Sequence, residues 1–233
     1  LHLDNTEIAK LQDGFSAIVI GDTNSSSKIY IGDETGTSDT VTVNDNLVLR
    51  NPVLGGKIYI NTDLVLEGDS SLLIDGSGHT VFMNADVTVS GDVFINDSLE
   101  VQGALGDVER VYTAGSDGSG QMQIGSSSSH FMNGNGDAID DELVLQSPDN
   151  IVIWTEVGNT DALEKLTIQG VNGNNPNNVT FHNEVTVDGD LIIYAEGTVT
   201  FNQAITLNNG GDLLIYGADS VVFEKGVNLN GGG

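Results

Sequence analysis

The sequence predicts an all-β protein folded as a parallel β-helix, or β-solenoid, with about three short strands in each coil. Apolar–x–apolar triplets recur at nearly constant offsets, separated by Asn, Asp and Gly, which favour turns. In a strand, the outer residues of such a triplet point to one side and the middle residue to the other. The 233 residues include 30 Gly and are only 38% hydrophobic, which suits a thin core lined by stacked coils.

Residues 1–40 are predicted to form an N-terminal capping segment that leads into the solenoid. Asp4-Asn5-Thr6-Glu7 has the pattern of a capping box, so we expect a short helix from Asn5 to Leu11. Ile8 and Leu11 would share one face of this helix, which would cover the end of the core. Residues 17–20 and 28–31 are β-branched and bounded by turn residues, which predicts two strands.

Residues 41–102 are predicted to form regular coils, because the triplets that begin at Val41, Leu64 and Val87 follow one another at a constant offset. Residues 103–142 break this rhythm with runs of Ser, Gly and Asn, which predicts either an irregular coil or a loop excursion. Regular coils are expected again over 143–233, and one helical turn is expected within them at 161–164. We interpret the chain as a single continuous domain and as a fragment of a longer chain.

The strongest repeat lies near the C-terminus, where Phe181, Phe201 and Phe223 end equivalent triplets at nearly equal spacing. Stacked coils would place these three rings in one inward column, with the middle Thr residues of the triplets facing solvent. A two-sheet sandwich is the competing fold, but it predicts antiparallel hairpins rather than triplets at constant offsets. We expect the end after Leu229 to lack a cap, and therefore to fray or to associate end to end.

The run from Asn178 to Leu229, with its repeated NVTF, VTVDGDLII, GTVTF and GGDLLIYGADSVVF, resembles the β-helical repeats of very large bacterial exoproteins. These are the filamentous-haemagglutinin-like adhesins and related giant surface proteins. The opening LQDGFSAIVIGD resembles a segment that precedes such repeats in some of them. The resemblance implies a right-handed parallel β-helix, an extracellular or bacterial cell-surface location, and a structural or adhesive role. It implies no catalytic or binding residue.

The chain is strongly acidic, with 34 Asp and Glu against 7 Lys and Arg and a net charge of −27. The basic residues are scattered along the sequence and are not expected to form a patch. Such a surface repels nucleic acid and anionic lipid. No apolar stretch approaches the ~20 residues that span a membrane, so no membrane insertion is expected. The absence of Cys excludes disulfides and thiolate metal sites.

The primary functional prediction is a non-catalytic structural shaft or adhesive segment of a large secreted bacterial surface protein. The alternative is a carbohydrate-active β-helix enzyme, a polysaccharide lyase or hydrolase, which would use paired carboxylates and a basic residue in a groove. The four His are scattered, and neither a nucleophile elbow nor a phosphate loop occurs. The sequence therefore favours the non-catalytic shaft or adhesive segment over the enzyme.

A candidate cation site lies at one predicted corner. Gly189-Asp190 and Gly211-Asp212 each precede the third strand of a coil, so Asp190 and Asp212 should stack, with Asp188 nearby. Stacked carboxylates repel unless a cation or a hydrogen-bond donor lies between them, and Ca²⁺ is the natural extracellular candidate. The alternative is that each Asp caps its corner by accepting backbone N–H groups.

Trp154 is the only Trp and alternates out of phase with Ile151 and Ile153, which predicts an outward ring that could stack on a sugar. The alternative is a ring packed under a neighbouring loop. The expected partners are neighbouring repeats of the parent chain and host or biofilm glycans or proteins.

Overall fold

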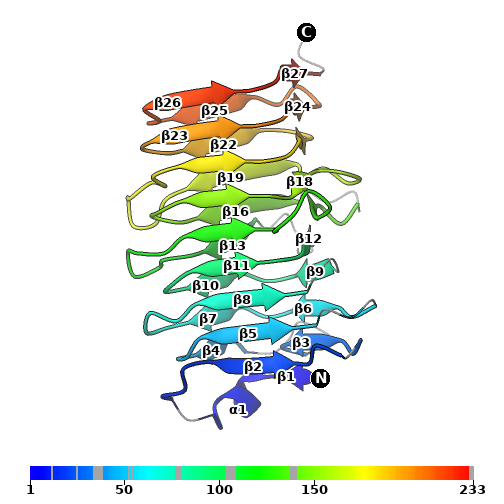
Figure 1. Ribbon diagram of the computed structural model, residues 1–233, viewed down its shortest axis with the longest axis vertical. Coiled ribbons are helices and arrows are strands. Elements are labelled where there is room, and N and C mark those ends of the chain that lie inside the picture. The colour runs from blue at the N-terminus through cyan, green and yellow to red at the C-terminus, as the bar shows by residue number, and fades with distance from the viewer. Residues whose placement is uncertain are drawn as a thin grey trace.

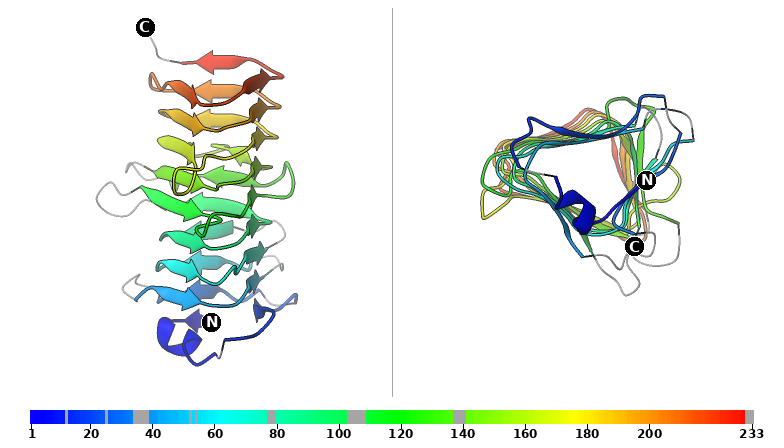
Figure 2. Two further views of the ribbon diagram at one scale, coloured as in Figure 1. Left: turned by 90° about the vertical axis from the view of Figure 1, so that its left-hand side faces the viewer. Right: turned by 90° about the horizontal axis from the view of Figure 1, so that it is seen from below.

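The computed structural model describes residues 1–11, 13–24, 26–33, 39–51, 53, 55–76, 80–102, 109–136 and 141–230. Over these residues the chain winds into a tall triangular prism of three sheets, which confirms the predicted β-solenoid (Figures 1 and 2). Each coil visits the nine-stranded, the ten-stranded and the eight-stranded sheet in turn. Strands of successive coils pair in parallel. The right hand that the resemblance implies stays a prediction.

The strands are short in all three sheets. In spatial order the ten-stranded sheet contains β1 (His2–Leu3), β3 (Ile29–Ile31), β6 (Ile58–Ile60), β9 (Thr80–Met83), β12 (Ser98–Val101), β15 (Phe131–Asn133), β18 (Glu156–Val157), β21 (Val185–Val187), β24 (Ile205–Leu207) and β27 (Val227–Leu229). The eight-stranded sheet contains β4 (Val41–Val43), β7 (Leu64–Leu66), β10 (Val87–Val89), β13 (Arg110–Thr113), β16 (Glu142–Gln146), β19 (Lys165–Gln169), β22 (Leu191–Tyr194) and β25 (Leu213–Tyr216). The nine-stranded sheet contains β2 (Ile18–Gly21), β5 (Leu47–Arg50), β8 (Leu72–Asp75), β11 (Val93–Ile95), β14 (Met122–Ile124), β17 (Ile151–Ile153), β20 (Val179–Phe181), β23 (Thr198–Phe201) and β26 (Ser220–Phe223).

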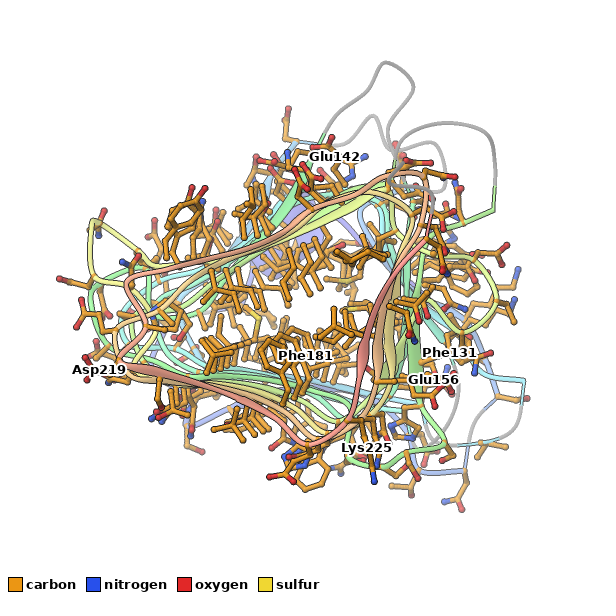
Figure 3. The ribbon with its side chains drawn as sticks, turned by 90° about the horizontal axis from the view of Figure 1, so that it is seen from above. Phe131, Glu142, Glu156, Phe181, Asp219 and Lys225 are labelled. Atoms are coloured by element: carbon orange, nitrogen blue, oxygen red, sulfur yellow. The ribbon has the colours of Figure 1, made fainter. Side chains whose placement is uncertain are left out.

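The core is a column of apolar side chains inside the triangle. Phe181 and Phe201 are each 1% exposed, and their rings stack with centroids 4.9 Å apart. Phe223 continues the column 5.3 Å above Phe201 but is 43% exposed, because no described coil lies above it. Figure 3 shows Phe181 inside the triangle and Glu142 and Glu156 outside it. The predicted inward column of three Phe is therefore confirmed.

The N-terminal helix α1 (Asn5–Ile8) has the predicted capping box. The side-chain carboxylate of Asp4 accepts the backbone N–H of Glu7, and the carboxylate of Glu7 accepts that of Asp4. It lies over the interior of the triangle and buries Ile8 in the core (Figure 2). The predicted extension to Leu11 is wrong. The helix ends at Ile8, and Leu11 is 43% exposed because the chain turns away toward β2.

Residues 103–142 contribute strands that stack in register with their neighbours. β13, β14 and β15 each pair with the strand of the coil before and the coil after. The extra residues lie in the corners, and residues 103–108 and 137–140 lie outside the described residues. The helical turn predicted at 161–164 is wrong, because the buried Leu163 forms a parallel bridge with Val187 instead.

The last described coil repeats the pattern of the coil below it. β26 and β27 pair in parallel with β23 and β24, so residues 220–230 form no separate cap. The core-lining side chains at this end are open to solvent, among them Val221, Phe223, Val227 and Leu229. Fraying or end-to-end association there stays a prediction. Among the described residues, no helix has the length and apolarity needed to cross a membrane.

Candidate functional site

The predicted cation site lies at the corner between the ten-stranded and the eight-stranded sheet. Asp190 and Asp212 directly precede β22 and β25, whose first residues pair, so the two carboxylates belong to successive coils as predicted. Asp190 Oδ1 accepts the backbone N–H of Asp212 at 2.8 Å. Asp188 Oδ1 accepts a hydrogen bond from Asn208 Nδ2, also at 2.8 Å. Asp188 and Asp190, which belong to the same coil, therefore each accept a hydrogen bond from an N–H group of the next coil.

Lys165 supplies a positive charge to the same column, which the sequence pattern does not predict. It directly precedes Leu166, which pairs with Leu191, so it lies one strand below Asp190. Its Nζ lies 2.9 Å from Glu142 Oε2 and 3.8 Å from Glu109 Oε2. The hydrogen bond to Glu142, helped by the charges of Glu142, Glu109 and Asp190, raises the pKa of the Lys165 ammonium group. The column therefore contains an ammonium group as well as carboxylates, so positive and negative charges lie next to each other.

The geometry of this corner matches the capping alternative. Throughout the described residues, no group of three or more His, Cys, Asp or Glu side chains is placed to hold a metal ion. A hollow of about 320 Å³ does open beside Asp190, Lys165, Glu142 and Glu164. Its lining includes an ammonium group, which opposes a bound cation. A calcium site at Asp188, Asp190 and Asp212 stays a prediction.

Trp154 occupies the corner between the nine-stranded and the ten-stranded sheet and is half-buried. Its ring stacks in parallel on His182 of the next coil, with centroids 3.5 Å apart. His182 Nδ1 lies 3.1 Å from Asn202 Nδ2, and burial lowers the pKa of the imidazole. One face of the indole is thus covered by a residue of the next coil, and a sugar contact of Trp154 stays a prediction.

A cavity of about 630 Å³ lies at the corner between the eight-stranded and the nine-stranded sheet. Its described lining contains Asp69, Asp92 and Asp149 with Ser, Gly, Gln and Asn residues, and no basic or aromatic side chain. Asp92 accepts the backbone N–H of Gln121 at 2.9 Å, and Asp149 accepts that of Gly120 at 3.3 Å. A hydrogen bond with Asp117 raises the pKa of Asp69. Asp92 and Asp149 therefore serve as corner caps between coils.

The structure also brings together basic residues that lie far apart in the sequence. Lys28 and Lys57 precede β3 and β6, which pair from Ile29 and Ile58 onward, so the two Lys are neighbours on the outer face of the ten-stranded sheet. Tyr30 and Tyr59 stack beside them with centroids 4.8 Å apart. The prediction that no basic residues cluster is wrong for this pair. The sequence does carry a signal for it, because the tetrapeptide KIYI occurs at both positions.

Comparison of the chain with protein-family models, with curated proteins and with solved structures finds no match.

Proposed function

We propose that the chain is a non-catalytic structural shaft, with an adhesive role, in a large secreted bacterial surface protein. The observation that carries this proposal is the unbroken stack of coils. In the ten-stranded sheet, nine strand spacings of ~4.8 Å correspond to a rod about 43 Å long. A rod of this kind holds binding surfaces away from the cell. The proposed location is the bacterial cell surface or the extracellular space.

The proposed partners are neighbouring coils of the same parent chain and glycans or proteins of a host or biofilm. The open upper coil supports the first partner, because its exposed Val221, Phe223, Val227 and Leu229 continue the inward columns below. Another coil of the same pattern would bury these side chains. The hydrophobic effect would then favour extension of the rod.

Extension of the rod tests this proposal. Residues 179–198 form one coil and can be inserted once, twice or three times after residue 198, where the register of β20 and β23 is the same. Each insertion should lengthen the particle by ~4.8 Å in small-angle X-ray scattering and keep a cooperative melt. Insertions that unfold the protein or leave its length unchanged would count against a modular shaft.

A carbohydrate-active enzyme is the second candidate. The cavity of about 630 Å³ and the raised pKa of Asp69 favour it, because the general acid of glycoside hydrolysis is a carboxyl group with a raised pKa. The cavity residues Asp92 and Asp149 are engaged with backbone N–H groups, which favours the shaft. Incubation with neutral and acidic polysaccharides should release neither reducing ends nor unsaturated products. Turnover that Asp69→Asn abolishes would establish the enzyme instead.

A further inference from the structure

A straight column of hydrogen-bonding side chains runs along the outer face of the nine-stranded sheet. Its members are the residues just before β8, β11, β14 and β17, namely Ser71, Asp92, Gln121 and Asn150. They lie one above another, because the first residues of these strands pair from coil to coil. Those first residues are buried in the core, so the four preceding side chains point outward. With ~4.8 Å between neighbouring strands, the column is ~14 Å long.

All four side chains of this column line the cavity of about 630 Å³ at the corner with the eight-stranded sheet. The rest of its described lining comes from the same four corners and consists of Asp69, Ser90, Gly91, Ser119, Gly120 and Asp149. The cavity therefore crosses four successive coils along the axis of the rod. Its volume lies in the range of ~300–1,000 Å³ that is common for ligand pockets.

The column keeps hydrogen-bonding groups that the corner itself does not use. Asp92 accepts the backbone N–H of Gln121 through Oδ1, and Asn150 accepts the carboxamide of Asn178 through Oδ1. Asp92 Oδ2, Asn150 Nδ2 and the carboxamide of Gln121 form no hydrogen bond with any described residue. Gln121 is also exposed. One carboxylate oxygen and two amide groups therefore remain for a ligand.

An apolar strip lies directly beside this column. Two residues further along the same strands, Leu73, Phe94 and Val152 also point outward and are half-buried. Gln123 occupies the remaining position of the strip, and its amide donates to the backbone oxygen of Gly125 at 3.0 Å. A ligand on this face would meet hydrogen-bonding groups along one side and apolar side chains along the other.

We infer that this face binds a neutral, extended, β-linked glycan whose chain lies along the axis of the rod. Sugar hydroxyls both donate and accept hydrogen bonds, which matches a carboxylate next to carboxamides, and the C–H surface of the sugar rings matches the apolar strip. A straight column with equal spacing suits a ribbon-like glycan better than a coiled α-linked one. The described lining contains no Lys, Arg or His, and its Asp residues repel acidic glycans.

This inference rests on the proposed function, since it gives the adhesive shaft a binding face and a ligand class. The test uses the full chain with four hexasaccharides: cellohexaose and mannohexaose, which are neutral and β-linked, maltohexaose, which is neutral and α-linked, and hexagalacturonate, which is acidic. Calorimetry should detect binding of at least one β-linked probe, unweakened by added NaCl. Maltohexaose should bind at least tenfold more weakly, and hexagalacturonate should not bind.

A first variant tests the hydrogen-bonding column. Gln121→Ala removes a carboxamide that has no partner but keeps the backbone N–H that Asp92 accepts. Affinity for the β-linked probe should therefore fall several-fold at an unchanged melting temperature. The matched control is Gln203→Ala, which removes an exposed carboxamide between β23 and β24 and should change affinity less than twofold.

A second variant tests the apolar strip. Phe94→Thr introduces the residue that the upper coils carry in the same column, at Thr180 and Thr200, and should lower affinity at least fivefold. Phe131→Thr removes a Phe from the ten-stranded sheet instead and should change affinity less than twofold.

Four results would overturn the site. They are equal affinity for the α-linked and β-linked probes, binding of hexagalacturonate as tight as that of the β-linked probes, equal losses in the variants and their controls, and no binding by a folded wild-type chain. An extended rod in scattering together with no binding would leave the shaft intact, so the two proposals fail separately.

Discussion

The carboxylate of Asp190 accepts a 2.8 Å hydrogen bond from the backbone N–H of Asp212, one coil above it. Asp190→Ala removes this acceptor and should lower the free energy of unfolding by about 1 kcal/mol. Asp190→Asn retains an oxygen at the same place and should cost clearly less. Chemical denaturation of both variants measures the difference. Equal losses in the two variants would show that the charge of Asp190, rather than its hydrogen bond, stabilises the corner.

The capping alternative predicts that Ca²⁺ has no specific effect on stability at this corner, unlike the predicted calcium site. Asp188 and Asp190 already accept hydrogen bonds from the coil above, and Lys165 lies in the same column. Salt should raise the melting temperature by screening a net charge of −27, and CaCl₂ should act like NaCl at matched ionic strength. Thermal melts in both salts measure this. A larger shift with CaCl₂ that Asp190→Asn/Asp212→Asn removes would restore the calcium site.

Phe201 should be the most costly ring of the core to remove. It stacks on Phe181 below and Phe223 above, and it is 1% exposed. Phe201→Ala should lower the free energy of unfolding by ~3–5 kcal/mol. Phe223→Ala is the matched control and should cost less, because Phe223 stacks on one ring and is 43% exposed. Urea denaturation compares them, and a smaller loss for Phe201→Ala would refute the stacked column.

His182 should make the protein less stable in acid. Burial lowers the pKa of His182, so below pH ~6.5 the unfolded chain takes up a proton that the folded chain resists. The free energy of unfolding should therefore fall as the pH drops from ~6.5 through the lowered folded pKa. Trp154 stacks on this ring and is the only Trp, so its fluorescence follows the titration directly.

Two variants check the origin of this acid sensitivity. His182→Gln should flatten the pH dependence of stability between pH ~6.5 and the acid range, although His130, whose pKa burial also lowers, keeps part of it. His2→Gln removes an exposed His instead and controls for the loss of any His. An unchanged slope in His182→Gln would refute the assignment.

The core could be predicted from the sequence because it depends on local rules. Alternation along a strand decides which side chains point inward, and the constant offsets near the C-terminus decide which coils stack, as the register of Phe181, Phe201 and Phe223 shows. The capping box at Asp4 and Glu7 is equally local. The position of Leu11 could not be predicted, because the end of a one-turn helix depends on where the chain must go next.

Two pairs of neighbouring side chains outside the core could not be predicted from the period of the repeats. Lys28 lies beside Lys57, and Trp154 lies beside His182, although each pair is further apart in the sequence than Phe181 is from Phe201. Residues that are joined through a long corner are therefore separated by more residues than the clear repeats near the C-terminus. A longer corner loop changes the sequence offset between two neighbouring residues but not the register of the strands that it joins. Such neighbours therefore cannot be found from a constant sequence offset.

Distances between spin labels test the stacked rod most directly. Thr42, Thr88 and Gln169 lie in one outward column of the eight-stranded sheet, and Gln169 is five strands from Thr42. The chain has no Cys, so Cys introduced at two positions can be labelled cleanly. The pair at Thr42 and Gln169 should give a narrow distribution near ~24 Å, and the pair at Thr42 and Tyr216, seven strands apart, one near ~34 Å. Broad distributions, or two distances that do not differ by about two strand spacings, would contradict a stiff shaft of parallel coils.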